Sequence, residues 1–331
     1  MTYHFIIEGS HTKGMGDVYA IIPVAQSLKK AGEKIDIVVL GRRSVLNLMR
    51  QNGFSAVHVS SLTDAIEIVE RRKAKIIILS RQQTAPHIIR RLKKRNRLVI
   101  TIDDVGNGAK TADFRINPLY KIPNSLHGPA FLPLGTEFNN ARIQRAQRSM
   151  QCANLLLTQG GADTRGFMPS LLKMIDTTLQ QITPNCRIFA LVGPCFTNLP
   201  ELRDTADQCI GEVHLLENIT NLSSLMIRMD LAISAGGITM YELCCIGIPT
   251  LVVCAEPWEA ESSASLSALG AVIDLGFSTP PDRQRLHRKL QDMLNTPQLR
   301  FELSQAARRA VDGQGASRVA QHLMHMAKKV C

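Results

Sequence analysis

The feature that most constrains this chain is the alternation of short apolar runs with longer amphipathic stretches. The apolar runs have the length of buried strands, and the stretches between them have the apolar spacing of helices. Strands of a parallel sheet are joined by crossover helices and are buried on both faces, so they are apolar throughout. We therefore predict an α/β fold built on parallel sheets. The predicted strands cover residues 3–7, 35–40, 76–80, 98–102, 154–158, 187–192, 230–234 and 250–254.

The length of 331 residues exceeds the size at which a single hydrophobic core usually keeps growing. The alternation pauses between about Asn117 and Gln151, where several prolines interrupt any regular period. We therefore predict one domain at residues 1–140 and a second at residues 150–311. A helix within residues 312–331 is expected to pack back on the first domain.

The formal net charge of +11 is concentrated in Arg71–Lys75 and Arg90–Arg97. One Trp and four Tyr provide no set of aromatic side chains to stack bases beside this charge, so we expect no nucleic acid partner. A solvated face is the first interpretation of these residues. Attraction of anionic substrates, or peripheral contact with an anionic membrane surface, is the alternative.

Targeting signals and metal motifs are missing from the sequence. No apolar run approaches the roughly 20 residues that cross a bilayer, and the first residues lack the features of a signal peptide, so we expect a cytoplasmic protein. The eight cysteines show no CxxC spacing, which favours reduced thiols in the core. The histidines show no metal-ligand spacing, and we assign neither a metal nor a cofactor. The oligomeric state stays open.

The most informative segment for function runs from Asp230 to Thr250 and reads DLAISAGGITMYELCCIGIPT. A strand there leads through Gly236 and Gly237 into a helix. Two glycines let the backbone approach a ligand closely, and a helix N-terminus offers free N–H groups and a positive dipole end to a diphosphate. Glu242, further along this helix, could accept hydrogen bonds from ribose hydroxyls. The alternative is a tight turn followed by a helix with an exposed glutamate.

A second glycine-rich loop follows the opening strand and contains Gly9, Gly14, Gly16 and Asp17. Its GMGD lacks the third glycine of a dinucleotide-binding fingerprint. The loop could instead bring Asp17 to a ligand as a general base. Capping of a helix that begins near Val18 is an equally good interpretation of this aspartate.

A third loop, LLLTQGGADTRGF, places Gly160, Gly161 and Asp163 directly after a strand. Its backbone amides could line the same ligand site, and a turn followed by a capped helix is the alternative. Asp103 and Asp104 also end a strand. Adjacent strand residues point to opposite faces, so we predict a structural loop or cap here rather than an acid/base pair.

Together these motifs resemble the UDP-sugar hydrolases of the pseudaminic acid pathway. That family is related to the MurG-type glycosyltransferases and has the GT-B fold, in which two Rossmann-like domains face an interdomain cleft. The similarity runs almost end to end, through GMGDVY, VITIDD, LLTQGGADTRG, the segment around Gly236, and VDGQGASRVA. The resemblance implies that Gly236, Gly237, Ile238 and Thr239 bind uridine diphosphate, with Glu242 on the ribose.

The resemblance also implies an inverting reaction. Water attacks the anomeric carbon with help from a histidine in the first glycine loop, and the C–O bond to UDP breaks. This chain has Asp17 in place of that histidine and Ala20 in place of a family arginine. Relatives often carry an Asn-Gln pair near the sugar, where this chain has Pro257 and Trp258 after Glu256. A partly desolvated aspartate can still serve as the base, because desolvation raises its pKa.

We therefore expect a hydrolase of UDP-linked amino sugars, with Asp17 as catalytic base, in nonulosonic-acid or surface-polysaccharide biosynthesis. A GT-B glycosyltransferase that passes the sugar from UDP to a hydroxyl acceptor is a close alternative. A nucleotide-sugar-binding protein that has lost catalysis is a third. The predicted substrate-binding residues are Gly14, Gly16, Gly160, Gly161, Asp163, Gly236, Gly237, Ile238, Thr239, Glu242 and Glu256.

Overall fold

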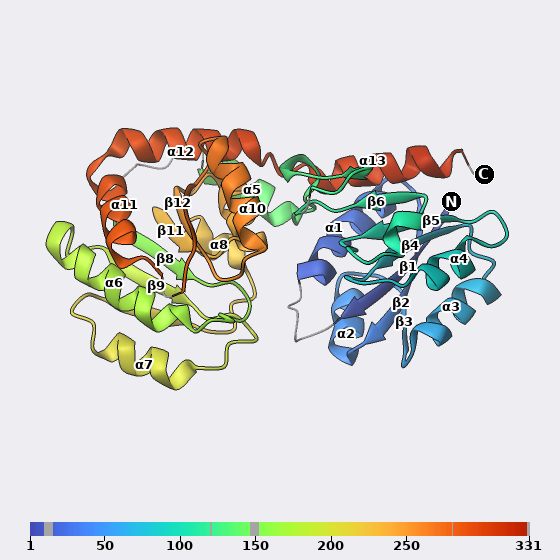
Figure 1. Cartoon of the computed structure of the whole chain (residues 1–331), viewed down its shortest axis with the longest axis horizontal. Coiled ribbons are helices and arrows are strands. Elements are labelled where there is room, and N and C mark those ends of the chain that lie inside the picture. The colour runs from blue at the N-terminus through green and yellow to red at the C-terminus, as the bar shows by residue number, and fades with distance from the viewer. Residues whose placement is uncertain (10–15, 120, 146–151, 280, 330–331) are drawn as a thin grey trace. The chain divides into compact units, whose positions relative to one another are not determined.

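The computed structural model describes residues 1–9, 16–119, 121–145, 152–279 and 281–329, without the side chains of residues 16 and 17. The chain divides into two compact units, one of Met1–Thr136 with Gly313–Cys331 and one of Glu137–Asp312 (Figure 1). Each unit contains one parallel sheet with helices packed against it. The predicted α/β class with two parallel sheets is confirmed.

In the described residues of the first unit, seven strands form a parallel sheet in the order β3-β2-β1-β4-β5-β6-β7. The strands are β1 Thr2–Gly9, β2 Lys34–Gly41, β3 Ala56–Val59, β4 Ile76–Ser80, β5 Leu98–Ile102, β6 Phe114–Ile116 and β7 Ser125–Leu126. Every residue of β4 and β5 is buried, as expected for central strands that are covered on both faces.

Two groups of helices cover this first sheet. They are α1 Gly16–Lys30, α2 Arg43–Gln51, α3 Leu62–Arg71, α4 Pro86–Lys93, the 3₁₀ turns η1 Ala109–Thr111 and η2 Pro129–Phe131, and α13 Gly315–Ala327. Apolar side chains of α1, α2 and α13 share one core with the sheet, and those of α3 and α4 share another. Val319 and Leu323 of α13 are fully buried in the first of these cores, and α13 lies beside α1 (Figure 1).

In the described residues of the second unit, six strands form a parallel sheet in the order β10-β9-β8-β11-β12-β13. The strands are β8 Asn154–Thr158, β9 Arg187–Leu191, β10 Val213–Leu216, β11 Leu231–Ser234, β12 Thr250–Cys254 and β13 Ile273–Phe277. The helices are α5 Thr136–Arg145, α6 Phe167–Ile182, α7 Leu199–Asp207, α8 Leu222–Met226, α9 Ile238–Ile246, α10 Glu259–Ala268, α11 Arg283–Asn295 and α12 Pro297–Ala310.

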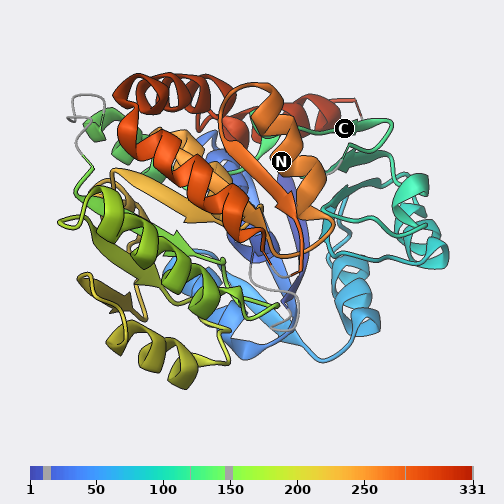
Figure 2. The same cartoon turned by 60° about the vertical axis from the view of Figure 1, so that its left-hand side comes forward.

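One face of the second sheet is covered by α6, α7 and α11, whose apolar side chains form a single core with it. Helices α6 and α11 lie side by side over this face (Figure 2). Among the helices that the structure describes, none is long and apolar enough to span a bilayer.

Each sheet has one place where the order of its strands reverses. In the first sheet this switch point lies between β1 and β4, and in the second between β8 and β11. Open parallel sheets bind ligands beyond the carboxyl ends of their strands at such a point, because the connections on either side of it lead away in opposite directions. In the second unit, the connections that follow β8 and β11 carry most of the predicted site residues.

Candidate functional site

The connection from β11 to α9 contains the double glycine of the predicted site. A Cβ at Gly236 would lie 2.7 Å from the Cβ of Glu259, so a larger residue does not fit there. Gly236 is buried, whereas Gly237, Ile238 and Thr239 are half-buried at the start of α9. The first amides of a helix have no partner within the helix, so this turn places free donors at an accessible position. A diphosphate is a suitable acceptor for them.

A buried carboxylate supports this turn from below. Glu259, at the start of α10, is 5% exposed, and its Oε2 accepts hydrogen bonds from the amides of Ala255 at 2.7 Å and Glu256 at 3.3 Å. Burial raises the pKa of Glu259, and the amides of Ala255, Glu256 and Gly236 oppose that rise. Glu259 therefore ties the connection after β12 to the one after β11. The sequence analysis did not identify it, because no motif distinguishes it from the other acidic residues of this segment.

Glu242 lies one turn into α9 and is half-buried. Burial, and then the charge of Glu137, raise the pKa of Glu242 to about 8, although a hydrogen bond from the Thr239 side chain opposes the shift. Hydroxyl donors from a ligand would favour the charged form.

The loop after β8 has a structural carboxylate at its centre. Asp163 is 7% exposed, and its two oxygens accept hydrogen bonds from the amides of Phe167 at 2.8 Å and Met168 at 2.9 Å. These are the first amides of α6, so Asp163 caps that helix. The capping bonds match the alternative of a turn followed by a capped helix, and a contact of Asp163 with substrate stays a prediction.

The glycines of the same loop are held by local hydrogen bonds. The Gly160 amide donates to the Thr158 hydroxyl at 3.2 Å, and the Gly161 carbonyl accepts from the Cys195 amide at 2.8 Å. Gly160 has a φ of +71°, which favours glycine at this position. The space where a Cβ would stand at Gly160 or Gly161 is open. These observations do not test the contact of Gly160 and Gly161 with substrate, which stays a prediction.

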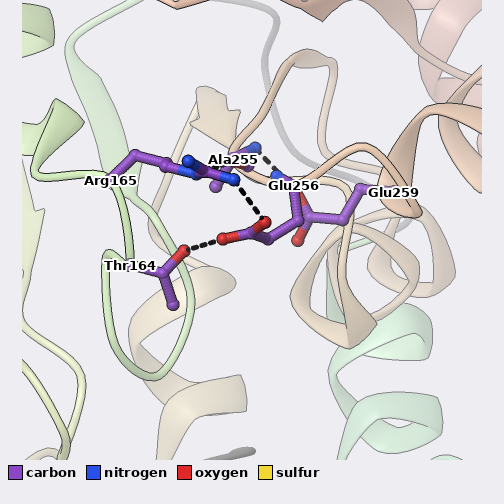
Figure 3. Close-up of polar contacts among 5 residues, drawn as sticks. All are labelled: Thr164, Arg165, Ala255, Glu256 and Glu259. Carbon is purple, nitrogen blue, oxygen red and sulfur yellow. Dashed lines mark hydrogen bonds and ion pairs between the residues drawn. The ribbon is translucent and has the colours of Figure 1, made fainter.

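Glu256 follows β12 and is bonded to the loop after β8 (Figure 3). Its Oε1 accepts from the Thr164 hydroxyl at 2.6 Å, and its Oε2 accepts from Arg165 Nη2 at 2.9 Å. The hydrogen bond from Thr164, and then that from Arg165, hold the pKa of Glu256 below its usual value. Because β11 lies between β8 and β12, these bonds pass across the carboxyl end of β11. The structure therefore brings Glu256 to the same sheet edge as Gly236.

Of the predicted site residues in the first unit, the structure describes only the backbone of Gly16 and Asp17. Gly14 lies outside the described residues. Gly16 and Asp17 are the first two residues of α1, so this helix begins before the predicted Val18. The position of the Asp17 side chain lies outside the described part, and its role as a base stays a prediction.

Asp104 also has a structural role. It is fully buried, and its Oδ1 accepts from the amides of Thr84 at 3.1 Å and Gly106 at 2.8 Å. Asp103 before it has a φ of +55°, which turns the chain away from the strand direction. The pair therefore forms a structural loop, as the sequence analysis favoured.

The two units contain parallel sheets that each reverse order at a switch point, which is the architecture of the GT-B fold. Solved structures with this fold include MurG of Acinetobacter baumannii, with a TM-score of 0.72 and 13% identity over 98% of this chain and 100% of that one. A putative UDP-N-acetylglucosamine 2-epimerase of Listeria monocytogenes has a TM-score of 0.70 and 12% identity over 100% and 97% of the two chains. The S. aureus MnaA–UDP co-structure has a TM-score of 0.67 and 11% identity over 99% and 97%. At such identities the likeness establishes the fold.

Two relatives are similar in sequence. The chain is 23% identical over 328 residues to the spore coat polysaccharide biosynthesis protein SpsG of Bacillus subtilis (strain 168), covering 94% of each. It is 24% identical over 272 residues to the uncharacterized protein MJ1062 of Methanocaldococcus jannaschii, covering 76% of this chain and 55% of that protein. No family model matches the chain.

Proposed function

We propose that this protein is a GT-B enzyme of polysaccharide biosynthesis that uses a UDP-linked amino sugar. The observation that carries the proposal is the glycine turn at Gly236 and Gly237, which places the accessible start of α9 at the switch point of the second sheet. The positive end of a helix at that point suits a diphosphate. The UDP complex of a structural neighbour and the name of the SpsG relative support the same assignment.

The nucleotide occupies the second unit in this proposal. The amides of Gly237, Ile238 and Thr239 donate to the phosphates, while Glu242, one turn further along α9, accepts from the ribose hydroxyls. Gly236 and Glu259 keep the turn in place, because the Gly236 amide interacts with the Glu259 carboxylate. A direct contact of Gly236 with the diphosphate stays a prediction.

The reaction we propose is hydrolysis at the anomeric carbon. Asp17 takes a proton from water as the water oxygen forms a bond to the anomeric carbon. The C–O bond to the diphosphate breaks, and its electron pair leaves with UDP. The products are the free sugar with inverted configuration and UDP.

Transfer of the sugar to a hydroxyl acceptor is the second candidate. It is favoured by the structural likeness to MurG and to the spinosyn rhamnosyltransferase SpnG, which has a TM-score of 0.66. The same residues serve in this reaction, except that Asp17 takes the proton from an acceptor hydroxyl instead of water.

A panel of UDP-linked acetamido sugars, with and without hydroxyl acceptors, tests the choice. UDP release at full rate without acceptor indicates the hydrolase. UDP release that requires an acceptor indicates the transferase. Absence of both turnover and UDP binding by calorimetry overturns the proposal.

Two substitutions separate catalysis from nucleotide binding. Asp17→Asn should lower turnover by roughly 100-fold or more, because the base is lost, and leave UDP affinity within about 3-fold.

Glu242→Ala should weaken UDP binding by about 10-fold through the lost ribose contact. Glu261→Ala, on the exposed side of α10, is the matched control and should change neither quantity. Full turnover in Asp17→Asn would remove Asp17 from the mechanism.

A further inference from the structure

The side chain of Arg165 makes three contacts, two of them with residues drawn in Figure 3. Its Nη2 donates to Glu256 Oε2 at 2.9 Å, and its Nε donates to the Ala255 carbonyl at 3.3 Å. Its guanidinium also lies 5.8 Å from the centre of the Phe277 ring. A planar group with these three contacts has a defined orientation, so little conformational entropy remains to be lost when it binds a further acceptor.

The arrangement differs from that of an ordinary surface ion pair. Arg203 and Glu217, in the same unit, make one contact at 2.7 Å and have side chains that are 57% and 35% exposed. The Arg165 side chain is 39% exposed, and Glu256 is itself fixed by the hydroxyl of Thr164. The extra contacts hold one guanidinium edge against the protein, while the side chain keeps access to solvent.

The side chain of Arg165 lies at the same edge of the sheet as the start of α9. Arg165 comes from the loop after β8 and reaches the connection after β12, and β11 is the strand between these two. Its side chain therefore crosses the carboxyl end of β11, where Gly236 and Gly237 lead into α9. Within the described part of the chain, no hydrogen bond involves Arg165 Nη1.

From this geometry we infer that Arg165 is a further substrate-binding residue, whose free edge binds the distal phosphate of the nucleoside diphosphate. The inference rests on the proposed function, because it assumes a diphosphate at the start of α9. In this arrangement the helix amides bind the proximal phosphate, and the arginine adds a charge-assisted hydrogen bond to the distal one. Glu256 is the positioning residue that orients the guanidinium.

Calorimetry with UDP and UMP tests the inference, because the two ligands differ in the distal phosphate alone. Arg165→Ala should weaken UDP binding by roughly 10- to 100-fold, the usual effect of losing a hydrogen bond to a charged group, and change UMP binding by less than about 3-fold. Arg165→Lys, which keeps the charge and loses the planar fork, should lie between Ala and wild type for UDP. Arg203→Ala is the matched control and should leave both ligands unaffected.

The outcomes separate this inference from the proposed function. If the wild type binds neither UDP nor UMP, the proposed function fails. If the wild type binds UDP and Arg165→Ala binds it equally well, or loses UDP and UMP to the same degree, the inference fails. Circular dichroism and thermal melting of each variant identify a folding defect. If Arg165→Ala does not fold, the folded Arg165→Lys variant is compared with wild type instead: weaker binding of UDP with unchanged binding of UMP supports the inference, and equal binding of UDP overturns it.

Discussion

Asp104 in the first unit and Glu259 in the second occupy matching places in their sheets. Each follows the second strand beyond the switch point, β5 or β12, and each is buried. Asp104 accepts from the amide of Thr84, in the connection after β4. Glu259 interacts in the same way with the amide of Gly236, in the connection after β11. One acidic residue thus ties together two neighbouring connections in both units.

The helices that follow these connections differ between the units. Helix α4 of the first unit begins with Pro86, which has no N–H group to offer a ligand. Helix α9 of the second begins with Ile238 after two glycines, so its amides are present and half-buried. The comparison teaches that the buried carboxylate belongs to the scaffold. The residues after it decide which sheet edge can bind an anion.

The largest effect is expected from Glu259→Ala. The change leaves the amides of Ala255 and Glu256 without their buried acceptor, and each such group costs about 1–3 kcal/mol. We expect the second unit to lose roughly 3 kcal/mol or more of unfolding free energy, and UDP binding to fall with it. Urea unfolding monitored by hydrogen exchange of residues 231–268 measures the loss in this unit alone.

Glu261→Ala provides the control for that experiment, since this exposed residue lies on the same helix. It should leave the exchange pattern unchanged. Unchanged protection of residues 231–268 in Glu259→Ala would show that the carboxylate does not support the turn, and the parallel with Asp104 would then be lost.

A smaller effect is expected from Asp104→Ala in the first unit. Here the amides of Thr84 and Gly106 lose one shared acceptor oxygen, and we expect a loss of about 2 kcal/mol. UDP affinity of the folded variant should stay within about 2-fold of wild type, because we place the nucleotide in the other unit. Glu67→Ala, on the exposed side of α3, serves as the control. A large loss of UDP affinity without unfolding would contradict the assignment of the nucleotide to the second unit.

The sequence predicted the central strands well, because buried parallel strands are apolar along their whole length. Each of the eight predicted strands has a counterpart in the structure, and β4, β5, β8 and β12 have the predicted bounds. The strands that were missed are β3, β6, β7, β10 and β13. They are short or lie toward the margins of the sheets, where polar residues such as His58 and Arg115 interrupt the apolar run.

The candidate site was predictable in part. The double glycine and Glu242 could be found, since a strand-to-helix turn with glycines has a recognisable spacing. The capping role of Asp163 was one of two alternatives for its loop, whereas the roles of Arg165 and Glu259 could not be found, because each depends on a partner that the fold supplies. Arg165 bonds to a carboxylate 91 positions further along the chain, and Glu259 interacts with the amide of Gly236 in the preceding connection. Local spacing contains no information on such pairings.

The smallest expected effect is a pH-dependent change in Tm, and it concerns the fifth residue of helices α4 and α9. In α4 this residue is Arg90, which is exposed, and in α9 it is Glu242, whose pKa is raised to about 8 by burial and by Glu137. A carboxyl group with a raised pKa in the folded state binds protons more tightly there than in the unfolded chain, whose ordinary value is 4.5. Its contribution to stability is therefore fully present below about pH 4.5 and is lost as the pH rises through about 8.

Glu242→Gln should change Tm little at pH 5 and raise it relative to wild type by a few degrees at pH 9. Arg90→Gln, the matched change on α4, should show no such trend. A Glu242→Gln difference that stays constant from pH 5 to pH 9 would mean that this carboxyl is ionised over the whole range, and that α9 holds it no differently from an exposed side chain.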